Sequence, residues 1–240
     1  MRINKYLADK QYSSRRQADE LIKEGIVFIN GRVAVLGDQV SETDVVEVKK
    51  SKNARPAVYF AYNKPIGVVT HSAQKGEIDI KEAIRHQTKE TLFPIGRLDK
   101  DSHGLIIMTN DGRITGKLLD PDEYHEKEYI VETKEKLIYN FDQLMERGVM
   151  IEDGNGKRFK TKPCVVRLLS DKKFSIILTE GKKHQIRRMC EALKMHVTDL
   201  KRVRVMNIEL GYLEPGGLKK IKGEELEEFL EDLGMENPNN

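Results

Sequence analysis

The sequence predicts an α+β protein in which a small N-terminal unit precedes a larger one. Short apolar runs typical of strands mix with amphipathic helical stretches, without the strict strand–helix–strand order of a doubly wound sheet. A polar, basic stretch closed by a proline, at 49–56, interrupts this periodicity and indicates a domain boundary. The chain has 240 residues, 38% of them hydrophobic, which suffices for a packed core in a two-domain arrangement.

The first strong element is a helix over 13–24. Ser14 is a candidate N-cap, and Gln17 follows three residues later, which is the spacing of a capping box. Gly25 suits the residue just beyond the helix, because glycine adopts the left-handed conformation readily. The N-terminal unit therefore begins with a capped helix.

Two β-rich runs follow within 27–35, and Asn30-Gly31 joins them. This pair tolerates the positive φ angles of a tight type I′ hairpin turn. The stretch 44–48 supplies a third short strand. The N-terminal unit thus combines a helix with a small antiparallel sheet.

The larger unit alternates strand and helix patterns punctuated by turn residues. Strands are expected at 58–62, 105–109, 128–132, 164–169 and 174–178, and helices at 79–85, 113–119, 137–147, 184–194 and 224–233.

Several functional classes lack their sequence signatures. No stretch approaches the roughly 18 apolar residues of a membrane span, and the N-terminus lacks the apolar core of a signal peptide, so we expect an unexported, cytoplasmic protein without a membrane partner. The two cysteines, Cys164 and Cys190, form no CxxC pair, and we expect them to be buried apolar fillers. The six histidines form no metal motif, and no GxGxxG follows a strand. We therefore expect neither a metal nor a cofactor.

Charge is distributed unevenly along the chain. The formal net charge is only +3, but residues 182–204 carry eight Lys/Arg against two acids. The segment 221–240 has seven acids and one lysine, so residues 1–220 carry +9. Such a basic body fits a partner that carries phosphates, or equally a solvated charged face.

Two arginines point to the nature of such a partner. Arg15 and Arg16 lie in the first turn of the capped helix, so they offer guanidinium groups near free backbone N–H groups. This arrangement suits an RNA phosphate backbone slightly better than the alternative, two solvated surface arginines.

A second candidate site is the loop that begins at Gly96. Asp99 stands shortly before the apolar strand 105–109, so its carboxylate is expected at a sheet edge, where functional groups often lie. Taken alone, an Arg-Leu-Asp tripeptide in a loop is more often a turn or a surface ion pair.

A third candidate site is the helix 184–194. Its first turn is basic, against the usual preference of helix N-termini for acidic residues. Ile186 and Met189 can face the core, while Arg187 lies beside this stripe and could reach a carboxylate. The alternative is that Arg187 and Arg188 are two surface charges.

The segment SSRRQADELIKEGIVFINGRVA resembles the S4 RNA-binding domain over roughly residues 2–49. The resemblance implies binding to structured RNA through the residues on the matching positions, which are Arg15, Arg16, Asn30, Gly31 and Arg32.

Four further motifs extend the resemblance to nearly the whole chain. GRLD followed by GLIIMTNDG, KEY at 127–129, GKKHQIRRM and NKPIGVVT are similar to the motifs of the S4-domain (RsuA-like) pseudouridine synthases, most closely those of the RluF type that modify large-subunit 23S rRNA. The resemblance implies an S4-like domain at 1–50, a linker at 51–57 and a catalytic domain at 58–240. That catalytic domain would have a mixed, mostly antiparallel sheet flanked by helices, ending in an acidic C-terminal helix.

The family's chemistry assigns roles to three residues. Uridine would become pseudouridine without a cofactor, with Asp99 as the nucleophile at C1′ of the ribose or C6 of the uracil. Arg187 would pair with Asp99 and keep it ionised. Tyr129 would stack on the flipped uracil, although a strand tyrosine taken alone more often fills a core. Further RNA contacts are expected from Arg97, Lys100, Lys182, Lys183 and Arg188.

The expected substrate is structured RNA, namely 23S rRNA, with a transfer RNA loop of similar shape as a second candidate, and the expected protein is a monomer. The alternative is a non-catalytic RNA-binding or ribosome-assembly factor, because S4 domains also occur in such proteins. A methyltransferase is a distant third reading, since no cofactor loop is found.

Overall fold

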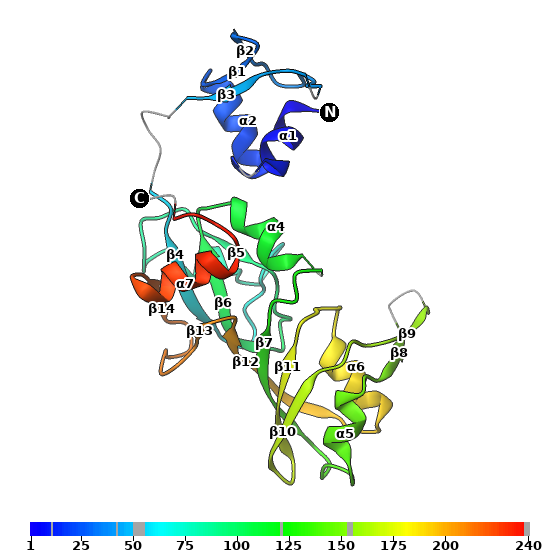
Figure 1. The fold of residues 1–240 in the computed structure, drawn as a ribbon. Helices are drawn as coiled ribbons and strands as arrows, with labels where there is room; N and C mark the ends of the chain where they lie inside the picture. Colours follow the sequence, from blue (N-terminus) through cyan, green and yellow to red (C-terminus); the bar gives the residue numbers. More distant parts are fainter. Residues whose placement is uncertain (11, 42, 50–55, 121, 153–155, 238–240) are drawn as a thin grey trace.

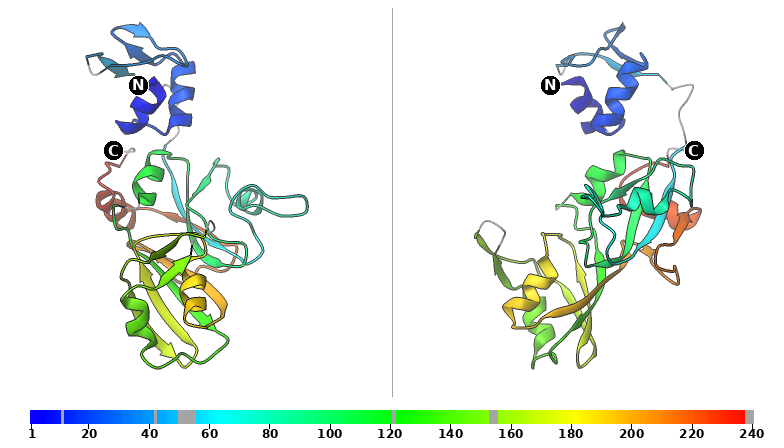
Figure 2. Two further views of the ribbon diagram at one scale, coloured as in Figure 1. Left: turned by 90° about the vertical axis from the view of Figure 1, so that its right-hand side faces the viewer. Right: turned by 180° about the vertical axis from the view of Figure 1, so that it is seen from behind.

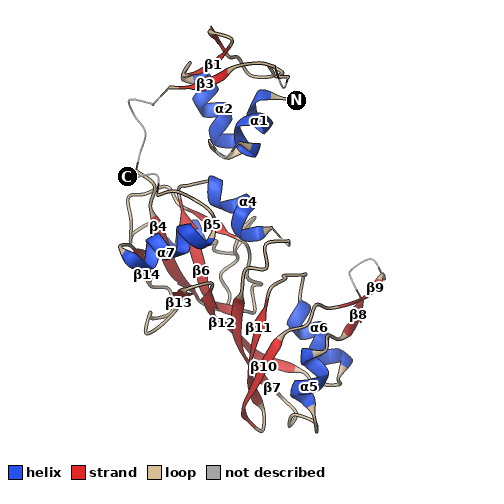
Figure 3. Cartoon of the chain, in the orientation of Figure 1, coloured by secondary structure: helices blue, strands red, loops and turns tan. Residues whose placement is uncertain are grey.

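The computed structural model describes residues 1–10, 12–41, 43–49, 56–120, 122–152 and 156–237. Their strands form one sheet of three strands, one of nine and one of two (Figures 1 and 3). Most of the linker expected at 51–57 lies outside the described residues; Pro56 and Ala57 belong to no helix or strand. No described helix is long and apolar enough to cross a membrane.

The N-terminal unit places two helices against the three-stranded sheet, which has the order β2-β1-β3. Its elements are α1 (Ile3–Asp9), α2 (Arg15–Lys23), β1 (Val27–Ile29), β2 (Arg32–Val33) and β3 (Val46–Val48). The predicted capping box is confirmed, since Ser14 Oγ accepts from the Gln17 amide and Gln17 Oε1 accepts from the Ser14 amide. The predicted turn is confirmed as well, with φ of 50° at Asn30 and 79° at Gly31. Helix α1 was not predicted.

The nine-stranded sheet has the path β10-β11-β7-β12-β6-β4-β14, with β13 paired to β12 and β5 paired to β6. Only β12 and β6 run parallel, so the predicted mixed, mostly antiparallel sheet is confirmed. Its strands are β4 (Tyr59–Lys64), β5 (Phe93–Ile95), β6 (His103–Thr109), β7 (Lys127–Thr133), β10 (Val165–Ser170), β11 (Lys173–Leu178), β12 (Val197–Val205), β13 (Ile208–Glu209) and β14 (Leu218–Ile221).

Five helices and one hairpin complete the larger unit in the described residues. They are α3 (Ile80–Ile84), α4 (Arg113–Leu119), α5 (Phe141–Glu146), α6 (Gln185–Ala192) and α7 (Glu224–Asp232), with β8 (Met150–Glu152) paired to β9 (Arg158–Lys160).

Helix α5 is shorter than the 137–147 expected from its apolar pattern. Asn140 has a left-handed backbone (φ 56°), which a helix interior excludes. The amide of Leu137 donates to the Asp171 carbonyl instead of to a helical partner. Leu137 therefore packs on the core without helical structure, whereas Ile138 and Tyr139 are exposed.

Strand β12 was missed altogether. Four of its nine residues are charged, so the sequence reads as a charge cluster rather than as a central strand. Nevertheless β12 lies between β6 and β7 in the middle of the sheet. Neighbouring strands satisfy its backbone, which a sequence pattern cannot reveal.

The sheet buries apolar side chains on both faces. Along β4, Tyr59 and Ala61 join a core with α4 and α7, whereas Phe60 and Tyr62 join a core with α3. The left view of Figure 2 shows the red helix α7 and the blue-green segment of α3 on opposite sides of the sheet. The acidic α7 is thus part of the fold, and it docks through the buried residues Leu226, Phe229 and Leu230.

The N-terminal unit contacts the larger one through the start of α2. Gln17 Nε2 donates to the Asn110 carbonyl (2.8 Å), and Gln17 Oε1 accepts from the Gly112 amide (3.1 Å). A Cβ at Gly112 would lie only 2.4 Å from the Ser14 side chain. Asn110 also donates to the carbonyl of Pro56, where the described chain of the larger unit begins. The capping residue Gln17 therefore serves both its own helix and the contact between the units.

Candidate active site

The loop that carries Asp99 is fixed by its backbone. Thr70 Oγ1 donates to the Leu98 carbonyl (2.7 Å) and accepts from the Leu98 amide (3.1 Å). The Gly67 amide donates to the Lys100 carbonyl (2.8 Å). The residues on both sides of Asp99 are thus held, while the Asp99 side chain remains 35% exposed. A carboxylate that is fixed yet open suits a reacting group.

The side chain of His184, which was not singled out by the sequence, lies next to Asp99. His184 Nε2 lies 3.3 Å from Asp99 Oδ1. The left-handed backbone of His184 (φ 53°) stands at the N-cap of α6, one turn ahead of Arg187. Its position three residues before Arg187 is the signal that could have grouped it with this site.

Arg187 does not pair with Asp99, so the expected ion pair is wrong in this structure. Its Nη2 lies 3.0 Å from Asp101 Oδ2 and donates to the Asp101 carbonyl (3.1 Å). Its Nη1 donates to the Val197 carbonyl of β12 (3.3 Å). These anchors direct the guanidinium to the end of the loop, whereas Asp99 faces the helix N-terminus and His184.

Lys64, at the end of β4, adds a buried cation beside the loop. It is fully buried, and its Nζ donates to the carbonyls of Pro65 and Val68. Burial lowers the pKa of Lys64 to about 8, although the charges of Asp101 and Asp99 act in the opposite direction. Lys64 of the NKPIGVVT segment is therefore a buried lysine that interacts electrostatically with Asp101 and Asp99.

Strand register places Tyr129 in one row with Lys64. Gly104 of β6 is opposite Lys64 on one side and Arg202 of β12 on the other, and Arg202 is opposite Tyr129 of β7. Directly opposite residues share a face of the sheet. A Cβ at Gly104 would lie 2.2 Å from the Arg202 carbonyl oxygen, so only glycine fits at position 104. The sheet thus brings together residues up to 138 positions apart in sequence, Lys64 and Arg202, on the face beside the Asp99 loop.

The buried carboxylate of Glu180 holds the loop that leads into α6. Glu180 Oε1 accepts from the Lys162 amide (2.9 Å) and from Gln185 Nε2 (2.7 Å). Gln185 Oε1 in turn accepts from the Lys182 amide (2.9 Å). This network orders the loop 180–185 and so positions His184 and Arg187.

The predicted RNA contacts near the site differ in their placement. Arg97, Lys100, Lys182 and Lys183 are exposed on the two loops that flank Asp99 and His184. Lys100 is also 2.7 Å from Glu77. Arg188 is separate from them, because it lines a shallow hollow together with Glu152, Arg158 and Glu191.

The predicted RNA contacts of the N-terminal unit fall into two groups. Arg15 and Arg16 are exposed, and neither has an ion-pair partner among the described residues. In contrast, Arg32 pairs with Asp38 (2.9 Å). Asn30 donates to Asp44 (2.7 Å) and Gly31 completes the turn, so these residues shape the hairpin.

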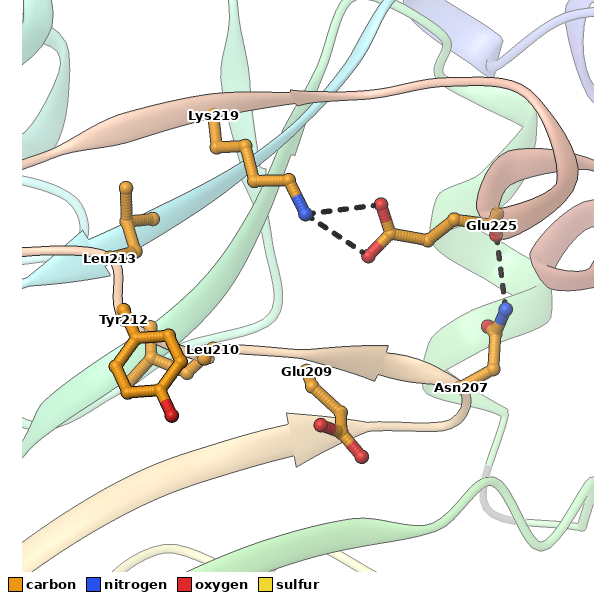
Figure 4. Close-up of a pocket in the computed structure, with 8 residues that line it drawn as sticks. Asn207, Glu209, Leu210, Tyr212, Leu213, Lys219 and Glu225 are labelled. Carbon is orange, nitrogen blue, oxygen red and sulfur yellow. Dashed lines mark hydrogen bonds and ion pairs between the residues drawn. The ribbon is translucent and has the colours of Figure 1, made fainter.

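A surface hollow with a volume of about 600 Å³ lies elsewhere, between β13, β14 and α7 (Figure 4). Lys219 Nζ pairs with Glu225 (3.3 Å), and Asn207 Nδ2 donates to the Glu225 carbonyl (3.0 Å). These contacts tie α7 to the sheet edge. None of the predicted site residues lines this hollow, so it is not the candidate site.

Two observations bear on metal binding and on the reactivity of the thiols. Within the described ranges, no three His, Cys, Asp or Glu side chains are grouped to hold a metal ion. Burial raises the pKa of both Cys164 and Cys190 to about 12, so neither thiol is activated.

Two sequence profiles match the chain. Residues 58–192 match the family described as RNA pseudouridylate synthase, and residues 1–46 match the S4 domain.

Individual relatives cover almost the whole chain. The dual-specificity RNA pseudouridine synthase RluF of Salmonella typhi is 40% identical over 94% of this chain and 77% of its own length. The ribosomal large subunit pseudouridine synthase B of Bacillus subtilis is 36% identical over 94% of this chain and 93% of its own. A solved structure described as a pseudouridylate synthase superposes with a TM-score of 0.70 at 27% identity, and covers 97% of this chain and 99% of its own.

Proposed function

Because this chain belongs to the RNA pseudouridylate synthase family, with an S4 domain ahead of the matched catalytic segment, we propose that it converts a uridine of 23S ribosomal RNA to pseudouridine. Among the matched relatives, one is named for the large ribosomal subunit and another for dual RNA specificity. A transfer RNA loop is accordingly the second candidate substrate. We take residues 1–50 as the RNA-binding domain and 58–240 as the catalytic domain of a cytoplasmic monomer.

The observation that carries this proposal is the surroundings of Asp99. Thr70 holds the backbone of the preceding residue Leu98, the Asp99 carboxylate is partly open, and Lys64 and His184 lie beside it. A carboxylate that is held in place yet open to the outside can approach a carbon of a bound nucleotide. Asp99 is therefore the proposed nucleophile.

In the proposed reaction the bond between N1 of uracil and C1′ of ribose breaks, the base turns, and C5 bonds to C1′. The C5 proton is lost and N1 gains a proton, so there is no net oxidation or group transfer. Asp99 attacks either C1′ or C6, and Tyr129 stacks on the extruded uracil. Stacking of one base on an aromatic ring contributes about 1–3 kcal/mol toward the cost of extrusion.

Arg187 acts on the nucleophile through the loop. Its bonds to the carboxylate and carbonyl of Asp101 hold the loop two residues after Asp99. We propose that Arg187 positions this loop, while the imidazole of His184 lies 3.3 Å from the nucleophile.

The test is to map pseudouridine by carbodiimide adduct and primer extension on unmodified 23S rRNA and transfer RNA transcripts. Wild-type protein and Asp99→Asn are compared at equal RNA binding. A new primer-extension stop that requires Asp99 supports the proposal and identifies the uridine. Absence of a stop on the transcripts and on precursor ribosomal particles would favour the non-catalytic assembly factor.

A further inference from the structure

Arg202 is a buried arginine without a carboxylate partner. It is only 4% exposed, and its Nε donates to the Leu105 carbonyl of β6 (2.6 Å). Its two terminal nitrogens form no hydrogen bond or ion pair with any residue that the structure describes. Such a charge costs free energy unless an anion or polar ligand completes its coordination.

Two other arginines around the site have carboxylate partners. Arg204, two residues further along β12, pairs with Glu126 (2.9 Å) and Glu128 (3.0 Å). Arg187 pairs with Asp101 (3.0 Å). Burial without such a partner among the described residues therefore distinguishes Arg202 from these two arginines.

The surroundings of Arg202 add positive charge rather than compensate it. Lys127 lies two residues from Tyr129 on β7, and burial together with the charge of Arg202 lowers the pKa of Lys127 to about 8. Lys127 Nζ donates only to the His125 carbonyl (3.0 Å) among the described residues. Among the described residues, the face beside Tyr129 thus carries Lys127 and Arg202, and no carboxylate is paired with either of them.

We propose that Arg202 binds the flipped uracil and stabilises the negative charge that this ring acquires during the reaction. This inference rests on the proposed function. Arg202 stands directly opposite Tyr129, on the same face, so a base stacked on Tyr129 would present its edge to the guanidinium. The base is the part of a flipped nucleotide that enters a buried pocket, whereas phosphates stay near the surface. The burial of Arg202 therefore favours the ring over a phosphate.

Either route of attack makes uracil electron-rich. When an oxygen of Asp99 bonds to C1′, the N1–C1′ bond breaks and its electron pair stays on N1, delocalised onto the ring carbonyl oxygens. When Asp99 instead bonds to C6, the displaced π pair spreads over C5 and O4. On the first route C5 then bonds to C1′ and displaces the Asp99 carboxylate. On the second route the N1–C1′ bond breaks, C5 bonds to C1′, and the Asp99 carboxylate leaves C6. On both routes C5 loses a proton and N1 gains one, so the electrons balance without an oxidant. A preorganised cation at the ring oxygens lowers the barrier in both cases.

The experiment measures single-turnover pseudouridine formation and RNA affinity for the full-length protein on unmodified 23S rRNA transcript. Arg202→Met removes the charge, and Arg202→Lys keeps it. Arg204→Met is the matched control, because it removes an arginine of the same strand whose charge is already paired. Thermal unfolding of each variant separates loss of folding from loss of chemistry.

We expect Arg202→Met to lower the rate at saturating protein by about 10²–10³-fold, with the RNA Kd changed less than about threefold and the salt dependence unchanged. Arg202→Lys should restore part of the rate, and Arg204→Met should stay within about threefold of wild type. A weaker Kd with a shallower salt slope would identify a phosphate contact and overturn the inference, as would a wild-type rate in a folded Arg202→Met. Wild-type protein that forms no pseudouridine would overturn the proposed function first.

Discussion

The Arg187 guanidinium lies 3.0 Å from the carboxylate of Asp101, two residues beyond the proposed nucleophile Asp99. Asp99 itself faces His184 at 3.3 Å. The two aspartates of one short loop thus have different partners. Asp101 fastens the loop to α6, and this leaves the Asp99 carboxylate accessible from solution.

Removing Arg187 should therefore harm the reaction far more than removing the charge of Asp101. Arg187→Met loses the bonds to the Asp101 and Val197 carbonyls, so we expect a fall of about 10²-fold or more in the single-turnover rate. Asp101→Asn leaves both backbone bonds in place and should cost less than about tenfold. Arg188→Met, which alters a neighbour without these bonds, is the control. Equal rates for Arg187→Met and wild type would contradict the positioning role.

Tyr129 should act through its ring as a stacking surface. Tyr129→Phe retains an aromatic face, so we expect RNA affinity and folding close to wild type. Tyr129→Leu should reduce kcat/KM by about 10–100-fold, since stacking of one base contributes about 1–3 kcal/mol. Thermal unfolding provides the control, because Tyr129 also packs on the core of α5 and α6. Unchanged kcat/KM in Tyr129→Leu would leave only the core-filling role.

Lys64 should make stability depend on pH in a defined direction. Burial lowers the pKa of Lys64 to about 8 in the folded protein, below the ordinary value of 10.5. Between these pH values the unfolded chain binds more protons than the folded one, so the contribution of Lys64 to the free energy of unfolding rises with pH, by at most about 1.4 kcal/mol per pH unit. Below pH 8 the penalty for burying the charge is fully present.

The measurement is the difference in unfolding free energy between wild type and Lys64→Met from pH 7 to pH 10.5. Titrations of other groups largely cancel in this difference. We expect it to shift in favour of wild type above about pH 8. A difference that is flat over this range would mean that Lys64 keeps its ordinary pKa.

Arg15 and Arg16 should contribute to RNA affinity through phosphate contacts. Each contact that is removed should lower the slope of log K against log salt by roughly one, so we expect the double variant Arg15→Ala/Arg16→Ala to lower it by up to about two. Arg32→Ala is the matched control, because its guanidinium is already paired with Asp38. Filter binding at several salt concentrations measures the slope. An equal slope for the double variant and wild type would mean that neither Arg15 nor Arg16 contacts an RNA phosphate.

Local sequence signals predicted the small elements best. The capping box of Ser14 and Gln17 and the Asn30-Gly31 turn are confirmed because their bonds join residues close in sequence. The same reasoning failed for α5, where the left-handed Asn140 starts the helix later than the apolar pattern suggests. It also missed β12, whose charged residues conceal a strand.

By itself, the sequence determined the α+β class, the family and the segments that carry Asp99, Tyr129 and Arg187. Those are properties of local pattern and of resemblance. Only the tertiary structure decided which charges meet, because ion pairs depend on strand order and on where loops end. In the structure Arg187 pairs with Asp101, and His184 lies next to Asp99. The register of β7 and β12, strands far apart in the chain, places Arg202 opposite Tyr129.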